Sequence, residues 1–238
     1  MASATSLSQH DSHVLGALFD PESSLSTSCQ IKDLDSVYYD VDTLSYLKGV
    51  ERQALASVNT ATPSNTDILR TIKILSRLIE DYPQYASAYN NRAEARRISN
   101  TVEELMRQPN TLSTIFADLD QAISLATPKH DLDPISTGDA AVLSSAHTHK
   151  AFLLYLASQV DTPGQMFGDV VDMAGRDREQ LEECASKNFA AGGRFGNKLA
   201  KQLAVKTNPY AKLCGSIIKE AMRREFDNMR KAHLVAKQ

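Results

Sequence analysis

One apolar stripe limits the fold of this 238-residue chain more than any other feature. Between Asn65 and Pro83, large apolar side chains recur at the i, i+4, i+7, i+11, i+14 spacing that places them on one face of an α-helix. These side chains are Ile68, Ile72, Leu75, Ile79 and Tyr82. Because the residue before a proline disfavours helical backbone, Pro83 should end the helix. The stripe therefore predicts a helix that starts at Asn65 and buries one face in a core.

Helical periodicity continues along the chain from residue 43, and no run of alternating β-branched residues competes with it. It predicts six helices in three pairs, and hence an all-α fold. The expected helices start near Asp42, at Asn65 and at residue 85, and then carry residues 112–123, about 139–160 and 181–189, the last stopping at Gly192 and Gly193.

Two further helices are expected near the C-terminus. One carries Leu199 and Leu203, and the last carries Leu213, Ile217 and Met222. Between them, Asn208 is a natural N-cap and Pro209 a natural first helical residue, because the N–H that proline lacks would be unsatisfied there anyway. The segment that begins at Asn208 is therefore predicted to start a helix.

Composition favours a soluble intracellular protein. We expect it in the cytoplasm, with the nucleus as a further location. Charged residues are 23% of the chain and the formal net charge is -3, so the overall field gives no reason to expect nucleic acid or an anionic membrane. The three widely spaced cysteines, Cys29, Cys184 and Cys214, fit reduced thiols better than a disulfide framework. No secretory signal is recognisable, and no stretch approaches the roughly 18 apolar residues of a membrane span.

The first 42 residues are expected to form a partly flexible arm. Residues 1–12 and 20–36 are rich in Ser, Thr, Asp and Gln, and should be mobile or loosely attached. Between them, "HVLGALFDP" places Val14, Leu15 and Leu18 on a short apolar stripe with Phe19. This segment is either a helical turn that packs back on the domain or a motif that partners recognise.

The stretch "YASAYNNRAEARR", residues 85–97, fits the first helix of a tetratricopeptide repeat. With Ala86 as the first repeat position, Tyr89 occupies the large aromatic position, Asn91 the sixth and Ala93 the small one. Pro83 matches the closing proline of the preceding repeat. The small residue lets the second helix, B, approach the first helix, A, while the aromatic fills the space between repeats.

In this register, extra residues lie between helices A and B of all three repeats. Gly49 is taken as the small position of the first repeat. The insertions "ASVNTATPSNT", "SNTVEELMRQPN" and "DTPGQMFGD" should form extended loops on one side of the solenoid. The third repeat is the least regular, because Asn188 replaces the usual alanine. We expect an arm over 1–42, three repeats over 43–196 and capping helices over 197–238.

The chain resembles the tetratricopeptide repeat protein 36 family, small intracellular proteins with three repeats. Three separated features carry the resemblance: "HVLGALFDP", "ASAYNNRAEARR" and "NPYAKLC", the last followed by an amphipathic helix. The resemblance implies a helical solenoid without catalytic activity, binding to a DnaK-type heat-shock chaperone, and a link to tyrosine catabolism.

In this fold the A helices line a concave groove, in which a peptide or helix of a partner could lie. The predicted partner-binding residues are Asn90, Asn91, Glu94, Arg97, Phe152 and Tyr155. An asparagine can offer donors and an acceptor to an extended peptide. Asn90 and Asn91 could equally cap turns or form hydrogen bonds between adjacent helices.

Tetratricopeptide domains that bind chaperone tails hold two carboxylates with Lys and Asn from the first A helix, Asn from the second, and Lys and Arg from the third. Asn91 matches the second-helix asparagine. Tyr46 and Val50 replace the first pair, and Ser145 and His149 replace the third, although Lys150 is adjacent. Each lost charge-assisted hydrogen bond costs roughly 1.5 to 3 kcal/mol, so we predict no standard clamp.

Enzymatic sites are not favoured, and no metal or cofactor is expected. His147 and His149 are two residues apart and point to different faces of a helix. The stretch "AAGGRFGNK" departs from the phosphate-loop spacing and follows a helix rather than a strand. Asp131 and Asp133 lack further ligands, and no cysteine has an evident basic partner in sequence.

The sequence therefore predicts a monomeric, non-catalytic adaptor that binds a protein or peptide in its groove, and neither nucleic acid nor a membrane. The alternative is a scaffold that uses its convex face or its inserted loops. In that case "HVLGALF" would block the groove.

Overall fold

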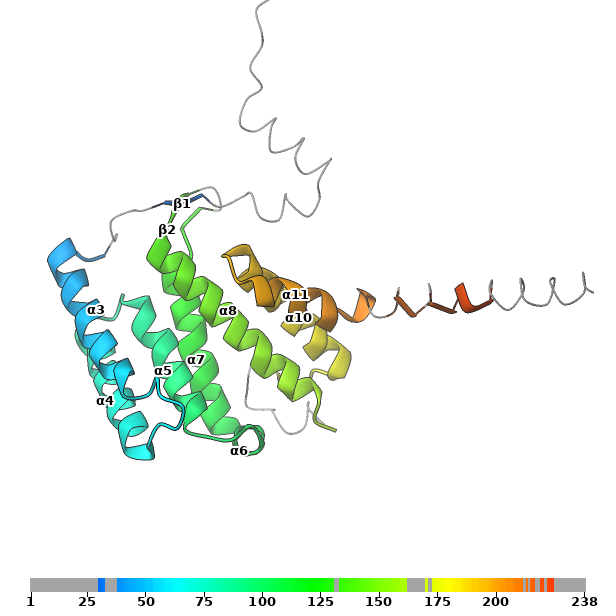
Figure 1. Ribbon diagram of the computed structural model, residues 1–238, viewed down its shortest axis with the longest axis horizontal. Helices are drawn as coiled ribbons and strands as arrows, with labels where there is room; N and C mark the ends of the chain where they lie inside the picture. Colours follow the sequence, from blue (N-terminus) through cyan, green and yellow to red (C-terminus); the bar gives the residue numbers. More distant parts are fainter. Residues whose placement is uncertain are drawn as a thin grey trace, which may run out of the picture.

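The computed structural model describes residues 30–32, 38–130, 133–161, 170 and 173–211, together with residues 213, 215, 216, 219, 220 and 222–224. Its elements are β1 (Ile31–Lys32), α3 (Val41–Ala56), α4 (Asn65–Asp81), α5 (Ala86–Ile98), α6 (Val102–Met106), α7 (Pro109–Ala126), β2 (Ile135–Ser136), α8 (Thr137–Ser158), α10 (Arg178–Arg194) and α11 (Lys198–Thr207) (Figure 1). The predicted all-α fold is confirmed. Helix α4 begins at Asn65 as expected, and its Ile68, Leu75 and Ile79 are buried.

Polar residues fix where most of the helices begin. In each case the side chain accepts a hydrogen bond from a backbone N–H of the first turn, which would otherwise have no partner. These caps are Asp40, Ser64, Thr101, Ser136, Asp177 and Asn197. Asn208 also accepts a hydrogen bond from the N–H of Tyr210, 2.9 Å away, and Pro209 is helical, so the predicted helix start at Asn208 is confirmed. The described residues that follow extend away from the helix pairs (Figure 1).

The helices stack in chain order. The main contacts join α3 to α4, α4 to α5, α5 to α7, α7 to α8, α8 to α10 and α10 to α11, and α5 also contacts α8. The A helices α3, α5 and α8 therefore form one layer, with the B helices α4, α7 and α10 behind them (Figure 1). Apolar residues of α3, α4 and α5 form one core cluster, those of α5 through α11 form a second, and Tyr89 packs against both.

The predicted extended loop after α5 is wrong, because part of it folds as α6. Thr101 and Glu104 form a capping box, in which each side chain accepts a hydrogen bond from the other residue's N–H. Leu105 and Met106 then pack into the core. The links α3–α4 and α5–α7 lie at the same end of the solenoid, as expected (Figure 1). The third insertion lies largely outside the described residues.

Residues 30–32 of the N-terminal arm are attached next to α8. Ile31 and Lys32 pair in parallel with Ile135 and Ser136, directly before α8, and the N–H of Ile135 donates to the carbonyl of Gln30 at 3.0 Å. These residues are thus paired with the segment before α8, while Ile31 stays 46% exposed, and the loose attachment expected for residues 20–36 stays a prediction. The "HVLGALF" segment lies outside the described residues.

Gly192 does not stop the sixth helix, contrary to the sequence prediction. Helix α10 continues to Arg194, and Gly192 faces α8. A Cβ atom at this position would lie 2.5 Å from Oγ1 of Thr148 and 3.1 Å from the carbonyl oxygen of Ser144. The glycine is therefore required by the close approach of α8 and α10.

A buried carboxylate joins three helices of the first two repeats. Asp118 of α7 is 4% exposed and accepts hydrogen bonds from Arg92 of α5, with Nε 3.0 Å from Oδ2 and Nη2 2.6 Å from Oδ1. Arg96 also binds Asp118, and Nη1 of Arg92 donates to Oγ of Ser76 in α4 at 3.1 Å. Two of the three arginines in the 85–97 stretch thus serve the fold.

Adding a methyl group at Gly192 should destabilise the protein. We expect Gly192→Ala to cost about 1–3 kcal/mol, because the methyl would press on Thr148 and on the backbone of α8. Gly49→Ala is the matched control, since Gly49 lies inside α3 with open space around it and should gain about 0.5–1 kcal/mol. Thermal unfolding followed by circular dichroism measures both. Equal melting temperatures for Gly192→Ala and wild type would contradict the close approach.

Removing the charge of Asp118 should also destabilise the protein. We expect Asp118→Asn to lower the free energy of unfolding by about 3–5 kcal/mol, because Arg92 and Arg96 would keep partly buried charges without a counter-ion. Urea unfolding measures this loss. The control is Glu183→Gln, which breaks an exposed pair with Lys187 and should change stability little. Similar losses for the two variants would show that the Asp118 cluster is not specially important.

Candidate partner-binding groove

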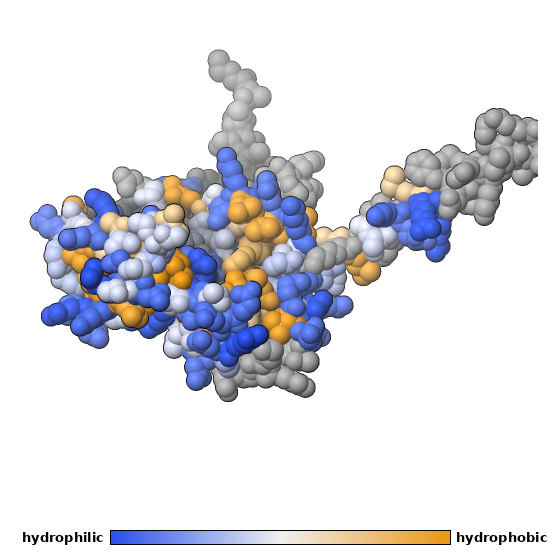
Figure 2. Space-filling model, turned by 60° about the horizontal axis from the view of Figure 1, so that its bottom comes forward, coloured by the Kyte–Doolittle hydropathy of each residue, from blue (hydrophilic) through white to orange (hydrophobic). Residues whose placement is uncertain are grey.

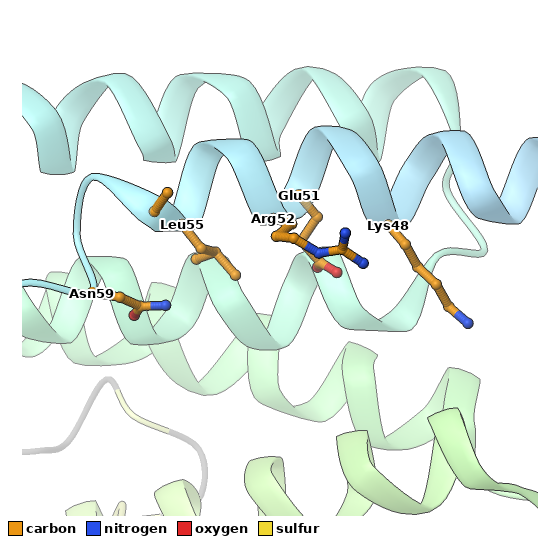
Figure 3. A pocket seen from close by; sticks show the side chains of 6 residues that line it. Lys48, Glu51, Arg52, Leu55 and Asn59 are labelled. Carbon is orange, nitrogen blue, oxygen red and sulfur yellow. The ribbon is translucent and has the colours of Figure 1, made fainter.

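A pocket of about 370 Å³ lies along the groove side of α3. It is lined by Lys48, Glu51, Arg52, Leu55, Ala56 and Asn59. Figure 3 shows that the labelled side chains leave α3 on the side where α5 lies. Their spacing of three, four, seven, eight and eleven residues from Lys48 defines one face of the helix. All six lining residues belong to α3 or to the turn that follows it. Below, the groove means the side of the A helices on which Asn91 contacts Glu51 of α3 and Asn90 contacts Ser145 of α8; that a partner binds there stays a prediction.

The burial of residues in α3 corrects the repeat register predicted for this helix. Gly49 is exposed, and a Cβ there would have no neighbour within 4 Å, so it does not occupy the closely packed small position. Ala54 is 4% exposed, and its carbonyl accepts a hydrogen bond from Oγ1 of Thr71 in α4 at 2.9 Å. Ala54 therefore occupies the small position, and the register moves by five residues. The first-helix clamp positions then hold Glu51 and Leu55 instead of Tyr46 and Val50.

Asn91 is bound to the first A helix. Its Nδ2 donates to Oε1 of Glu51 at 2.8 Å and lies 3.3 Å from Oγ of Ser87. Glu51 is 8% exposed, and its Oε2 accepts a hydrogen bond from the hydroxyl of Tyr85 at 2.7 Å. Burial and the nearby negative charge of Glu51 raise the pKa of the Tyr85 hydroxyl well above its usual value. The amide of Asn91 thus serves a contact between α3 and α5.

Asn90 faces the third A helix. It is 7% exposed, and its Nδ2 lies 3.3 Å from Oγ of Ser145 and 3.3 Å from Oδ1 of Asn91. Its Oδ1 is buried and has no hydrogen-bond partner among the residues described. The adjacent asparagines therefore connect α5 to both neighbouring A helices. This is the inter-helix alternative that the sequence left open beside ligand binding.

Glu94 and Arg97 neutralise each other beside a buried histidine. Nε of Arg97 donates to Oε2 of Glu94 at 3.0 Å, and Nδ1 of His149 lies 3.4 Å from the same oxygen. Burial lowers the pKa of His149 to about 4, and the charge of Glu94 only partly opposes this shift. Burial acts to raise the pKa of Glu94, but the hydrogen bond from Arg97 and the charges of His149 and Arg97 outweigh it, so that pKa is lowered. At neutral pH His149 is uncharged.

Helix α8 exposes an aromatic ring. Phe152 of α8 is 41% exposed, whereas Tyr155 is half-buried and packs against the core. On the face seen in Figure 2, apolar residues reach the surface in patches within largely hydrophilic surroundings. Lys150, which is next to a clamp position, pairs with Asp120 of α7 instead. Of the six predicted binding residues, the structure brings four together on α5, namely Asn90, Asn91, Glu94 and Arg97. Phe152 and Tyr155 lie on α8. Whether these residues bind a partner stays a prediction.

Sequence reasoning missed Lys48, Glu51 and Arg52. Their common face could have been found from Leu47, Ala54 and Val58, which are all buried. These three residues are spaced by seven and four positions, so they lie on one side of α3, next to the face that lines the pocket. Once those apolar residues are taken as the core face, the pocket residues follow as its flank. This assignment was missed because Gly49, which is exposed, was taken as the small position of the repeat.

Residues considered for chemistry have structural partners. Nδ1 of His147 lies 3.0 Å from Oδ1 of Asn188, which explains a polar residue in place of the usual alanine. The expectation that no cysteine has a basic partner is wrong for Cys184, since Nη1 of Arg176 lies 2.7 Å from its Sγ. In the part of the chain that is described, no group of three or more His, Cys, Asp or Glu residues is arranged to hold a metal ion. None of the described helices is long and apolar enough to cross a membrane.

The buried His149 should make stability depend on pH. Because its pKa is about 4 in the folded protein and near 6.5 when exposed, the unfolded chain takes up a proton first as the pH falls. We expect His149 to remove up to about 3 kcal/mol of stability between pH 6.5 and pH 4. Urea unfolding of His149→Gln should therefore show a weaker dependence on pH than wild type. His130→Gln is the exposed control, and an identical dependence in both variants would contradict the assignment.

Several known proteins match the chain over nearly its full length. The L-tyrosine degradation gene cluster protein hmgX of Aspergillus fumigatus is 40% identical over 246 residues, which cover 95% of this chain and 96% of that protein. Tetratricopeptide repeat protein 36 of Danio rerio is 27% identical, covering 90% of this chain and 92% of the relative. Its Drosophila melanogaster homolog is 25% identical, covering 94% and 96%.

Comparison with family models and with solved structures found no match. The full-length relatives and the helical repeat fold are nevertheless consistent with one another. On this evidence, the chain belongs to the tetratricopeptide repeat protein 36 family.

Proposed function

We propose that this protein is a non-catalytic adaptor in the breakdown of L-tyrosine, and that it binds a partner protein in the groove of its A helices. The observation that carries the first part is the 40% identity with hmgX, a protein named for an L-tyrosine degradation gene cluster. Because the match covers nearly the whole of both chains, it supports a shared role rather than a shared repeat alone.

The contacts of the polar residues in the groove support an adaptor rather than an enzyme. Glu51 accepts hydrogen bonds from Tyr85 and Asn91, and Glu94 is paired with Arg97. An acid or base in catalysis needs a free atom directed at the substrate. Glu51 instead joins α3 to α5, and Glu94 also lies 3.4 Å from Nδ1 of His149 in α8, so both help to hold the A helices in place.

The exposed part of the groove supports protein binding. Phe152 presents an aromatic ring on α8, with Tyr155 beside it, and aromatic residues often provide much of the free energy of binding at protein interfaces. Asn91, Glu94 and Arg97 of α5 are half-buried and would form the floor, with the buried Asn90 beneath them. We propose that the partner contacts this floor through its backbone and Phe152 through an apolar side chain.

The family resemblance adds a DnaK-type chaperone as a candidate partner. A chaperone tail held by a standard clamp would place a carboxylate at Asn91, next to the negative charge of Glu51. Leu55 supplies no donor at the other first-helix position. We therefore propose that any contact with such a chaperone uses a part other than its terminal tail. The protein would act in the cytoplasm, with the nucleus as a further site.

The test compares two single substitutions in the full-length chain. Phe152→Glu alters the groove, and Leu69→Glu is the control, because Leu69 is 64% exposed on α4, away from the A helices. Each tagged variant is purified from cells of the source organism grown on L-tyrosine. We expect wild type and Leu69→Glu to recover an enzyme of tyrosine breakdown or a chaperone, identified by mass spectrometry, and Phe152→Glu to recover at least about tenfold less.

Two results would contradict the proposal. One is equal recovery of the identified partner by Phe152→Glu and Leu69→Glu. The other is turnover of an intermediate of tyrosine breakdown by the purified wild-type protein alone. Circular dichroism of each variant first establishes that the fold is kept.

A further inference from the structure

Two cations line the pocket of α3. Lys48 and Arg52 are exposed, and neither forms a hydrogen bond or an ion pair with any residue that the structure describes. They lie one turn apart, so they share a face of the helix. In Figure 3 both side chains leave α3 on the side that faces α5. The open space of the pocket therefore lies beside two unpaired positive charges.

The other charged groups of the groove contribute little net charge. Glu94 is neutralised by Arg97, and the pKa of His149 lies far below neutral pH. Glu51 is negative, but it is 8% exposed and already accepts hydrogen bonds from Tyr85 and Asn91. The exposed charge of the groove is thus positive and lies on α3, while the α8 side presents Phe152.

We propose that the pocket along α3 binds side-chain carboxylates of an acidic segment in the partner protein. Lys48 and Arg52 would donate charge-assisted hydrogen bonds to these carboxylates, and Asn59 would supply an amide at the end of the pocket. This inference rests on the proposed binding of a partner in the groove. It adds the chemistry of one part of that partner: Asp or Glu beside α3 and an apolar side chain beside Phe152.

The position of Glu51 distinguishes side-chain carboxylates from a chain terminus. A terminal carboxylate that reached Asn91 would lie against the buried carboxylate of Glu51, and like charges repel strongly where water is excluded. Carboxylates on side chains can instead stop at the rim, at Lys48 and Arg52. The proposed segment accordingly keeps its carboxylates at the rim and does not place one at Asn91.

The experiment uses the full-length protein and defined peptides. Three pools of short fluorescein-labelled peptides are acetylated and amidated at their ends. In every pool, some positions are randomised and one position is aromatic. The remaining positions are all Glu in the first pool, all Gln in the second and all Lys in the third. We expect the Glu pool to bind about tenfold or more tightly than the other two, and to weaken as salt is raised, when measured by fluorescence anisotropy.

Two charge reversals locate the site. The double variant Lys48→Glu with Arg52→Glu should lose the preference for the Glu pool. The matched control is Lys73→Glu with Arg77→Glu on α4, since these cations are also exposed, one turn apart and without a partner among the described residues. The control has the same change in net charge and should keep the preference. Thermal unfolding of both variants ensures that lost binding is not lost folding.

Three results would overturn the inference. They are equal binding of the Glu and Gln pools, an unchanged preference in the Lys48/Arg52 variant, and binding only by a fourth Glu pool whose C-terminus is left as a free carboxylate. The proposed function fails separately. If the identified partner is recovered in a Phe152-dependent manner but is unaffected by the Lys48/Arg52 reversal, the adaptor role stands and the acidic segment does not.

Discussion

The buried carboxylate of Asp118 holds the first two repeats in one arrangement. Its partners Arg92 and Arg96 lie on the opposite side of α5 from the groove, and Arg92 reaches on to Ser76 of α4. A carboxylate at this depth is stable only with charged partners in good geometry. Because α5 is thereby fixed against α4 and α7, its other face is fixed as well, and that face carries Asn90, Asn91 and Glu94.

Most of the helices could be predicted from the sequence because their apolar residues recur with helical spacing. The stripe of α4 is the clearest example, since Ile68, Leu75 and Ile79 are all buried. The helix start at Asn208 was also predictable, because a cap acts on its own first turn. By contrast, Gly192 has two possible roles, ending a helix or allowing another helix close, and only the position of Thr148 decides between them.

The candidate site was predictable only in part. The repeat register identified Asn91, but its contact with Glu51 lies forty residues away in the chain. Asn90 and Ser145 are separated by fifty-five residues. No spacing rule covers such pairs, because they depend on how two A helices lie against each other. The error at Gly49 has the same origin: a small residue in a helix indicates close packing only if a neighbour is there.

The pairing of residues 30–32 with residues 135 and 136 limits how far the solenoid can open. Lys32 is held at the start of α8, and Asp40 caps the start of α3. Seven residues lie between them, so their Cα atoms are eight residue steps apart and at most roughly 28 Å from each other. The chain between them therefore limits the distance between the N-terminal ends of the first and third A helices. Stretching of the stacked helix pairs is restricted at this end.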